Sequence, residues 1–435
     1  MKLWFRFLVV AAVALAVCPA KAAPAVGTAH EMYQSEISAA RRDGISVSVA
    51  DLYRGYRPLS TNAAGVYRQI GEYLNRTGHK DSEAAALYAV TKRDPNAADW
   101  STARRFLSDN QSLVALVHRA ASMSYIADRH DNVDNPLDIT FPLLASMRRS
   151  ARIVTIESLV LAHAGRSVDA IRNQSLNFRI ADQGVHDILV ISWLVATAID
   201  VINMAGMQDI LIRSNGDPQV AAAIDRSIRE HWRPRSLVGP FKSECALSCS
   251  LIEYLRRIGP AAAYNLSSDS KTERVPNLPP NLLQKSIWDT FLDTNGTAIL
   301  RGMRPVIHVS DMPYNWSKPI VDPMRLGGND KGMSYTYAAS LLAVMADVVP
   351  RRAIIGAKAA ITRAACAVFV YKSKHGQYPP TLTDADKADL DPFDGKALRY
   401  RLEGNGFVIY SVGPTGKYDG GVVDGKGHEE VFRYP

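Results

Sequence analysis

Apolar residues recur at helical spacing through most of the chain, from about residue 28 to residue 302. Val66, Ile70 and Leu74, for example, follow one another at four-residue steps, which places them on one face of an α-helix. Similar patterns continue between breaks that contain Asn, Asp, Pro or Gly. Residues 23–302 are therefore predicted to form an irregular helical array.

Two segments of this array predict longer or more deeply buried helices. Residues 142–164 form a long helix pattern, which Gly165 ends and Ser167 restarts as an N-cap. The surrounding residues weakly resemble the turn between paired tetratricopeptide helices, although no 34-residue period repeats elsewhere. Residues 188–199 are apolar on every side but too few to cross a membrane, which predicts a helix enclosed by other helices.

Residues 303–332 contain four prolines and three glycines and predict a long irregular loop. Loops of this length inside a compact protein often line a functional site. Tyr314 and Trp316 are therefore candidate binding residues. The alternative is that the loop packs across the helices and buries both aromatic side chains.

The period of the pattern changes in the final segment, 333–435. Two helices are predicted over 334–348 and 351–372, separated by Pro350. Alternating apolar residues over 398–403, a Gly-Asn-Gly turn and a second apolar run over 407–412 then predict a hairpin, with a last strand at 431–434. The fold class is thus mainly α, with a small α+β module and an antiparallel sheet at the end.

Several short motifs in this module have the order and spacing of a known family. They are Tyr371 with His375-Gly376-Gln377-Tyr378-Pro379 and Leu382, then Asp391-Pro392-Phe393 with Gly395, then Leu398-Arg399-Tyr400, and finally Phe407-Val408-Ile409-Tyr410-Ser411-Val412-Gly413-Pro414-Thr415-Gly416. The segment resembles the globular part of the major pseudopilin of bacterial type II secretion, over roughly the last sixth of the chain. The helical remainder looks like large exported bacterial proteins that end in the same module.

This resemblance implies a partner in the cell envelope or in a secretion system, and a calcium ion in the final loop. Thr415 stands where the family has an aspartate, so Asp419 and Asp424 are the candidate calcium ligands that remain. The alternative is a solvated acidic loop without metal. The chain lacks the basic leader and the Phe-Thr-Leu-x-Glu apolar helix of pseudopilins, so polymerisation by their route is not expected.

The N-terminus predicts export. Lys2 and Arg6 precede an uncharged apolar run over 7–17, and Ala20-Lys21-Ala22 follows as a small-residue cleavage site. We expect a signal peptide over 1–22, cleaved near Ala22, and a mature protein in the periplasm or outside the cell without a transmembrane span. The alternatives are an uncleaved anchor and a lipoprotein modified at Cys18.

Composition and net charge exclude few classes of binding partner. The chain has 435 residues, 47% hydrophobic and 22% charged, which is ordinary for a globular protein. Its net charge of +8 falls to +5 when the signal segment with its three basic residues is removed, and no continuous basic stripe predicts nucleic-acid binding. Cys245 and Cys249 lie on one face of a predicted helix, where two small buried apolar side chains are favoured over a strained disulfide.

No sequence motif identifies a catalytic centre or an organic cofactor. The chain contains no His-Glu-x-x-His, no Gly-x-Ser-x-Gly and no glycine-rich phosphate loop after a predicted strand. The favoured interpretation is an exported bacterial envelope protein of a non-catalytic binding or scaffold type, linked to secretion. The alternative is an exported hydrolase with its site in the helical domain, under the loop at 303–332.

Overall fold

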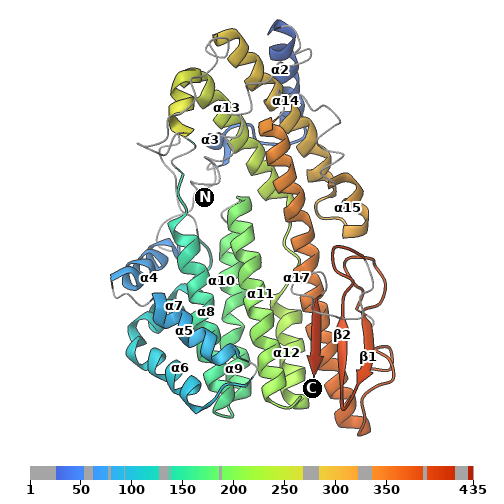
Figure 1. Ribbon diagram of the computed structural model, residues 1–435. Helices are drawn as coiled ribbons and strands as arrows, with labels where there is room; N and C mark the ends of the chain where they lie inside the picture. The colour runs from blue at the N-terminus through green and yellow to red at the C-terminus, as the bar shows by residue number, and fades with distance from the viewer. Residues whose placement is uncertain are drawn as a thin grey trace.

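The computed structural model describes residues 26–52, 62–76, 80–92, 94–126, 136, 139–185, 189–267, 284–321, 336–385, 389–416 and 430–434. This part of the chain is mainly helical and has one three-stranded antiparallel sheet. Figure 1 shows one long helix, α17, running beside both an upper and a lower group of helices, with the sheet against its lower half.

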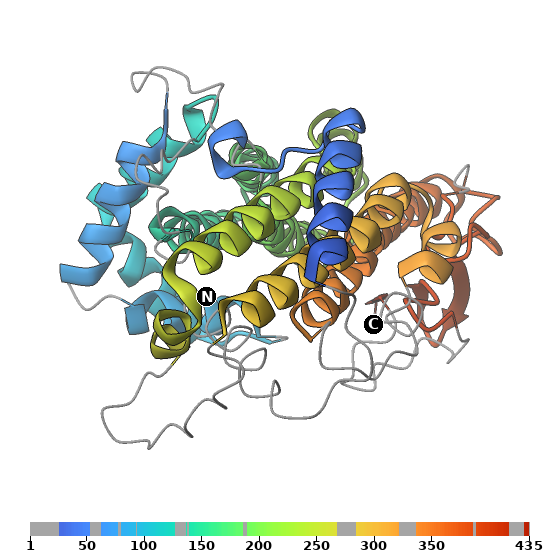
Figure 2. The same ribbon diagram turned by 90° about the horizontal axis from the view of Figure 1, so that it is seen from above.

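The lower group contains the described helices between residues 64 and 231. They are α4 (Ala64–Arg76), α5 (Lys80–Thr91), α6 (Ala97–Asp109), α7 (Gln111–Ser122), α8 (Pro142–His163), α9 (Ser167–Gln174), α10 (Leu176–Val185), α11 (Val190–Arg213) and α12 (Pro218–His231). Figure 2 shows α4–α6 and the sheet at opposite sides of the molecule, with the central helices between them.

The ends of several of these helices follow from local chemistry. The Asn96 side chain accepts the backbone N–H groups of Ala98 and Asp99, and Asp99 accepts that of Asn96, which closes a capping box at α6. Gly165, with φ of +77°, ends α8 as the pattern predicts. Gly216, with φ of +68°, joins α11 to α12 where a side chain would overlap the ring of Phe369 on α17.

The upper group contains the remaining helices. They are α2 (Val26–Arg42), α3 (Val49–Leu52), α13 (Val238–Ser267), α14 (Lys285–Val309), α15 (Tyr314–Val321) and the first half of α17 (Thr336–His375). Their core is separate from that of the lower group and includes Tyr33, Phe241, Leu300 and Leu342. Cys245 and Cys249 on α13 are free and buried in this core, as small apolar side chains would be.

The sheet has the order β1 (Arg399–Glu403), β2 (Gly406–Tyr410), β3 (Val431–Tyr434), with antiparallel pairs. The predicted hairpin is confirmed: Leu402 pairs with Phe407, and Gly404 turns the chain with a φ of +57°. Every residue of β2 is buried. Phe407 belongs to the same core as the lower helices, so the segment predicted as a module, 333–435, shares its core with the helical array.

Proline breaks the helices less than the sequence pattern predicts. The predicted loop at 303–332 is wrong in two places, because α14 continues through Pro305 to Val309 and α15 contains Pro319. Likewise α17 is one helix across Pro350, where two helices were predicted. A proline inside a helix costs about 3 kcal/mol. At Pro305 and Pro350, burial of the flanking residues in the cores outweighs that loss. The residues beside Pro319 are exposed, so this explanation does not extend to α15.

At Pro350 this compensation comes from two sides. Val348 and Val349 before it belong to the upper core, whereas Ala353 and Ile355 after it are buried against the sheet module and the lower group. The helix therefore passes from one core to the other at the proline. The last part of the predicted loop, residues 322–332, lies outside the described residues.

Two of the described helices, α11 and the segment Tyr337–His375 of α17, are long and apolar enough to cross a membrane by length and composition. Most of the apolar window of each is buried inside the protein. The enclosed helix predicted over 188–199 is confirmed from Val190 onward, because Val190, Trp193 and Ile199 on it are buried. The absence of a transmembrane span stays a prediction.

Glu244 on α13 predicts a pH dependence of stability. Burial raises the pKa of its carboxyl to about 7, although the side chain accepts the backbone N–H of Val190 at the start of α11. The folded state therefore holds the proton more tightly than the unfolded chain does. The stability that the folded protein gains from this tighter proton binding is fully present below the ordinary glutamate pKa. It is lost as the pH rises toward 7.

We expect Glu244→Gln to stabilise the protein by about 2 kcal/mol at about pH 8 and to change little at about pH 5, measured by denaturant unfolding. Glutamine keeps an oxygen that can accept the Val190 N–H but never carries the charge. Glu31→Gln, at an exposed position of α2, is the control and should be neutral at both pH values. An equal effect of Glu244→Gln at both pH values would contradict the explanation.

A candidate binding pocket beside Tyr314

A pocket of about 370 Å³ lies where the helical groups meet the C-terminal module. It is bounded by the link between α12 and α13, the link between α14 and α15, the middle of α17, and Pro392. Most of its lining is apolar or aromatic, from Trp232, Pro313, Tyr314, Val349, Ala353 and Pro392. The polar side chains in the lining are those of Ser310, Asp311, Ser317 and Arg352.

Tyr314 is the predicted binding residue that the structure brings into this pocket. It is the first residue of α15, and the edge of its ring meets Phe393 at a centroid distance of 5.1 Å. Phe393 is itself buried with Ala353 and Val412, so the tyrosine is positioned by the module. Burial raises the pKa of the Tyr314 hydroxyl, which therefore stays protonated at neutral pH.

Trp316, the second predicted binding residue, lies in the same short helix. Its side chain lies outside the described residues, so its predicted role stays a prediction. The next turn of α15 is held against the module, because Lys318 Nζ donates to the carbonyl oxygen of Pro414 at 3.1 Å. The helix that carries both aromatic residues is thus attached to the end of the sheet.

The two charged side chains of the pocket are used to hold its walls together. Asp311 Oδ1 accepts the backbone N–H of Leu237 at 2.8 Å, at the start of α13. Arg352 Nε donates to the carbonyl oxygen of Arg235 at 3.2 Å and lies 3.7 Å from Asp311 Oδ1. These contacts join α17 to both links that border the pocket.

A buried ion pair lies directly behind this wall. Arg235 Nε and Nη2 donate to the Asp200 carboxylate at 2.8 and 3.1 Å, and Nη1 donates to Asp182 at 2.6 Å. Asp200 is 0% exposed, and burial raises its pKa although the guanidinium opposes that shift. Arg235 therefore fixes the α12–α13 link to α10 and α11.

The described lining of the pocket holds few ionisable side chains. Among the described lining residues one carboxylate and one guanidinium are present, and no histidine or cysteine accompanies the serines. Within the described part of the chain no three His, Cys, Asp or Glu side chains are grouped as metal ligands would be. The hydrolase alternative predicts converging carboxylates or histidines at this place, where the described lining holds the single carboxylate of Asp311. That alternative stays a prediction.

The candidate calcium ligands Asp419 and Asp424 lie outside the described residues. Glu430, the first described residue after them, forms an ion pair with Lys358 on α17. Its backbone oxygen also accepts the N–H of Ser411 at 3.0 Å. The end of the acidic loop is therefore attached to α17 and to the residue after β2.

Sequence reasoning missed three residues of this pocket. Trp232 and Arg352 are far apart in the chain, and neither belongs to a motif. Asp311 lies in the predicted loop, but no sequence motif marks it as a pocket residue. The Trp-Arg-Pro-Arg run at 232–235, between two helices, is the sequence feature that could have indicated an aromatic link at a surface.

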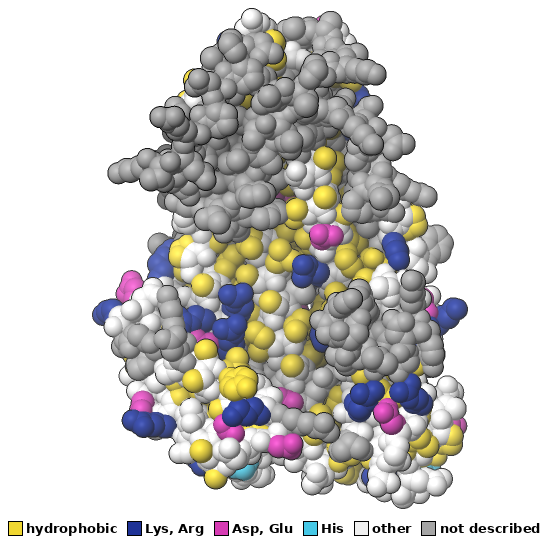
Figure 3. Space-filling model, viewed as in Figure 1, with side chains coloured by type: hydrophobic (Ala, Val, Ile, Leu, Met, Phe, Trp, Pro, Cys, Tyr) yellow, Lys and Arg dark blue, Asp and Glu magenta, His cyan; other side chains and the backbone are white. Residues whose placement is uncertain are grey.

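A larger cavity of about 550 Å³ lies between α4, α5 and α8. Glu83, 1% exposed, accepts Arg149 Nε at 2.6 Å and lies 3.7 Å from Arg152 Nη1. Figure 3 shows Lys and Arg side chains gathered over this part of the surface. Because its buried carboxylate is neutralised by two guanidinium groups, Glu83 acts as a structural anchor in the cavity wall.

No family model, no curated protein and no solved structure matches this chain. The role of the pocket beside Tyr314 is therefore inferred from its own residues and contacts.

Proposed function

We propose that this chain is an exported bacterial envelope protein that binds a segment of another protein in the pocket beside Tyr314. The N-terminal pattern of charge, apolar run and small-residue site supports export. The helix followed by an antiparallel sheet is the arrangement expected of the pseudopilin-like module, which supports a link to secretion. The proposed role is that of a binding or scaffold component without catalysis.

One observation carries the proposal: the aromatic and proline lining of a concave pocket built jointly by the helical body and the module. Concave apolar pockets with a few polar groups are typical binding sites. Trp232 and Tyr314 supply the large apolar surface that dominates recognition at protein interfaces. The partner segment is expected to insert an apolar side chain there and to bind the tyrosine hydroxyl through a polar group.

Fractionation tests the export part of the proposal. The full chain, tagged at its C-terminus, is expected in the periplasmic or extracellular fraction with residues 1–22 removed. The N-terminal sequence of the purified protein measures the cleavage. Recovery in the cytoplasm alone, with the N-terminus intact, would contradict the proposal.

Quantitative pull-down from envelope extract tests the pocket. Tyr314→Ala is expected to lower the recovery of a specifically captured protein by about tenfold or more, because an aromatic anchor is removed. Tyr88→Ala is the matched control, since Tyr88 is 71% exposed on α5 and remote from the pocket. Equal recovery with both variants, each folded by circular dichroism, would exclude the pocket as the binding site.

A further inference from the structure

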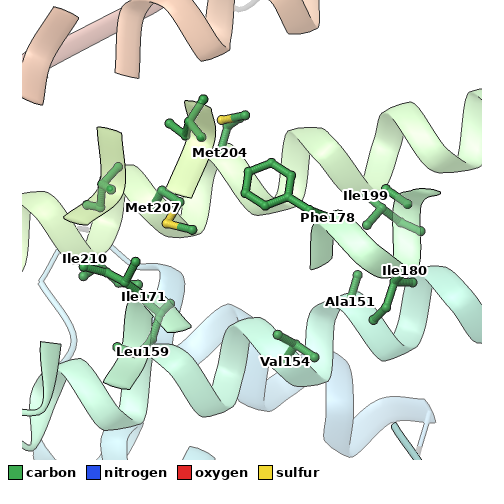
Figure 4. Packing of buried hydrophobic residues seen from close by; sticks show 14 of the residues in the cluster. Ala151, Val154, Leu159, Ile171, Phe178, Ile180, Ile199, Met204, Met207 and Ile210 are labelled. Carbon is green, nitrogen blue, oxygen red and sulfur yellow. The ribbon is translucent and has the colours of Figure 1, made fainter. Parts of the chain in front are cut away.

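A second surface feature lies away from the pocket beside Tyr314. A groove of about 360 Å³ runs between α9 and α10 on one side and α12 on the other. Beneath it, Ile171 lies close to Leu159 and Ile210 in the lower core (Figure 4). The groove therefore rests on the packed lower core, while Val168 on its rim is 52% exposed.

Three helices each place one arginine in this groove. Arg172 comes from α9, Arg179 from α10 and Arg226 from α12, and His231 lies at the end of α12. Arg172 donates to Asp169 at 3.1 Å. Neither Arg179 nor Arg226 forms an ion pair with any described residue. The one carboxylate among the described lining residues is that of Glu230, which is exposed.

Two other arginines near the groove share a carboxylate instead. Arg229, one turn along α12, pairs with Asp225 at 2.8 Å, and Arg363 on α17 shares the same carboxylate at 3.0 Å. Three guanidinium groups against the one lining carboxylate leave the groove with an excess of positive charge, which an anion between them would reduce. The charge of the groove is therefore complementary to that of a negatively charged ligand.

The two hydroxyl groups of the groove already donate their protons within the protein and are not free to bind an anion. Ser175 Oγ donates to the carbonyl oxygen of Ile171 at 2.7 Å and lies 2.6 Å from Ser227 Oγ. Since the proton of Ser175 is used on the carbonyl, Ser227 donates to Ser175, and both protons are committed. Recognition of an anion would therefore come from the guanidinium groups.

We propose that this groove binds a phosphate group, with Arg179 and Arg226 as its main ligands and Arg172 as the third. A guanidinium presents a planar fork of donors that matches phosphate oxygens. The groove is larger than a phosphate ion, and its apolar residues Val168, Leu176 and Ala223 leave room for the organic part of a phosphate ester. The phosphate belongs either to a soluble ester or to a lipid headgroup.

Calorimetric titration of the full chain with inorganic phosphate tests the shared chemistry, with chloride at equal ionic strength as the reference. The double variant Arg179→Gln/Arg226→Gln is expected to weaken phosphate binding by about tenfold or more. Arg229→Gln is the matched control, because it removes one positive charge from the same helix but from a paired side chain. It should change the affinity by about twofold at most.

Sedimentation with vesicles distinguishes the two sources of phosphate. Binding to mixed phosphatidylcholine–phosphatidylglycerol vesicles, lost in the double variant, would assign a lipid headgroup. Phosphate binding without vesicle binding would assign a soluble ester. Absence of both, or a loss with Arg229→Gln as large as with the double variant, would overturn the proposal.

Discussion

Arg235→Ala is expected to destabilise the protein by about 3–5 kcal/mol, because it leaves the buried Asp200 carboxylate without its counter-charge. Asp200 lies on α11, is 0% exposed and accepts two hydrogen bonds from this arginine. The same side chain also holds Asp182 on α10, so one substitution releases the α12–α13 link from two helices. Denaturant unfolding followed by far-ultraviolet circular dichroism measures the loss.

Two further variants identify the cause. Adding Asp200→Asn to Arg235→Ala removes the stranded charge and should recover a large part of the lost stability. Arg166→Ala, which breaks an exposed ion pair with Asp169, should cost less than about 1 kcal/mol.

Because burial raises the pKa of Asp200, the loss of stability in Arg235→Ala should be larger at about pH 8 than at about pH 5. A loss no greater than that of Arg166→Ala would contradict the buried-charge explanation.

Phe407→Ala is expected to cost about 3–5 kcal/mol, as the loss of a fully buried aromatic ring from a packed core does. Its ring lies 5.3 Å from that of Phe369 and 5.2 Å from that of Tyr378 between centroids. Since Phe407 shares its core with the lower helices, the sheet and the helical body should unfold in one transition. Near- and far-ultraviolet circular dichroism during unfolding measure the two parts.

Leu402→Ala is the matched control for Phe407→Ala. Leu402 is paired directly with Phe407 in the sheet register but is 53% exposed, so its truncation should cost less than about 1 kcal/mol. Equal losses in the two variants would mean that strand pairing, and not the core, carries the stability. An early separate transition of the sheet in Phe407→Ala would contradict a shared core.

Local patterns predicted the elements whose causes are local. The four-residue steps of Val66, Ile70 and Leu74 lie in α4, and all three side chains are buried there. Gly165 ends α8 and Gly404 turns the hairpin, because both positions need a positive φ that glycine adopts without strain. The enclosed helix over 188–199 was also predictable, since a segment that is apolar all round must be covered on every side.

The prolines mark the limit of this reasoning. A rule that considers only neighbouring residues ends a helix at Pro305, Pro319 or Pro350, because each lacks an amide proton. Whether the rest of the turn stays helical depends on what the flanking residues bury, and that is set by segments far away in the chain. The residues on both sides of Pro350 lie in different cores, which no local pattern shows.

Local patterns were sufficient to predict that the chain is mainly helical, that a hairpin lies near its C-terminus and that Tyr314 is a candidate binding residue. The packing of distant helices places Trp232, Asp311 and Arg352 around that tyrosine. It also brings Arg179 and Arg226, which form no ion pair with a described residue, into one groove. The physical reason is range: helix and turn signals act within a few residues, whereas a pocket is made by side chains that approach only when distant helices pack.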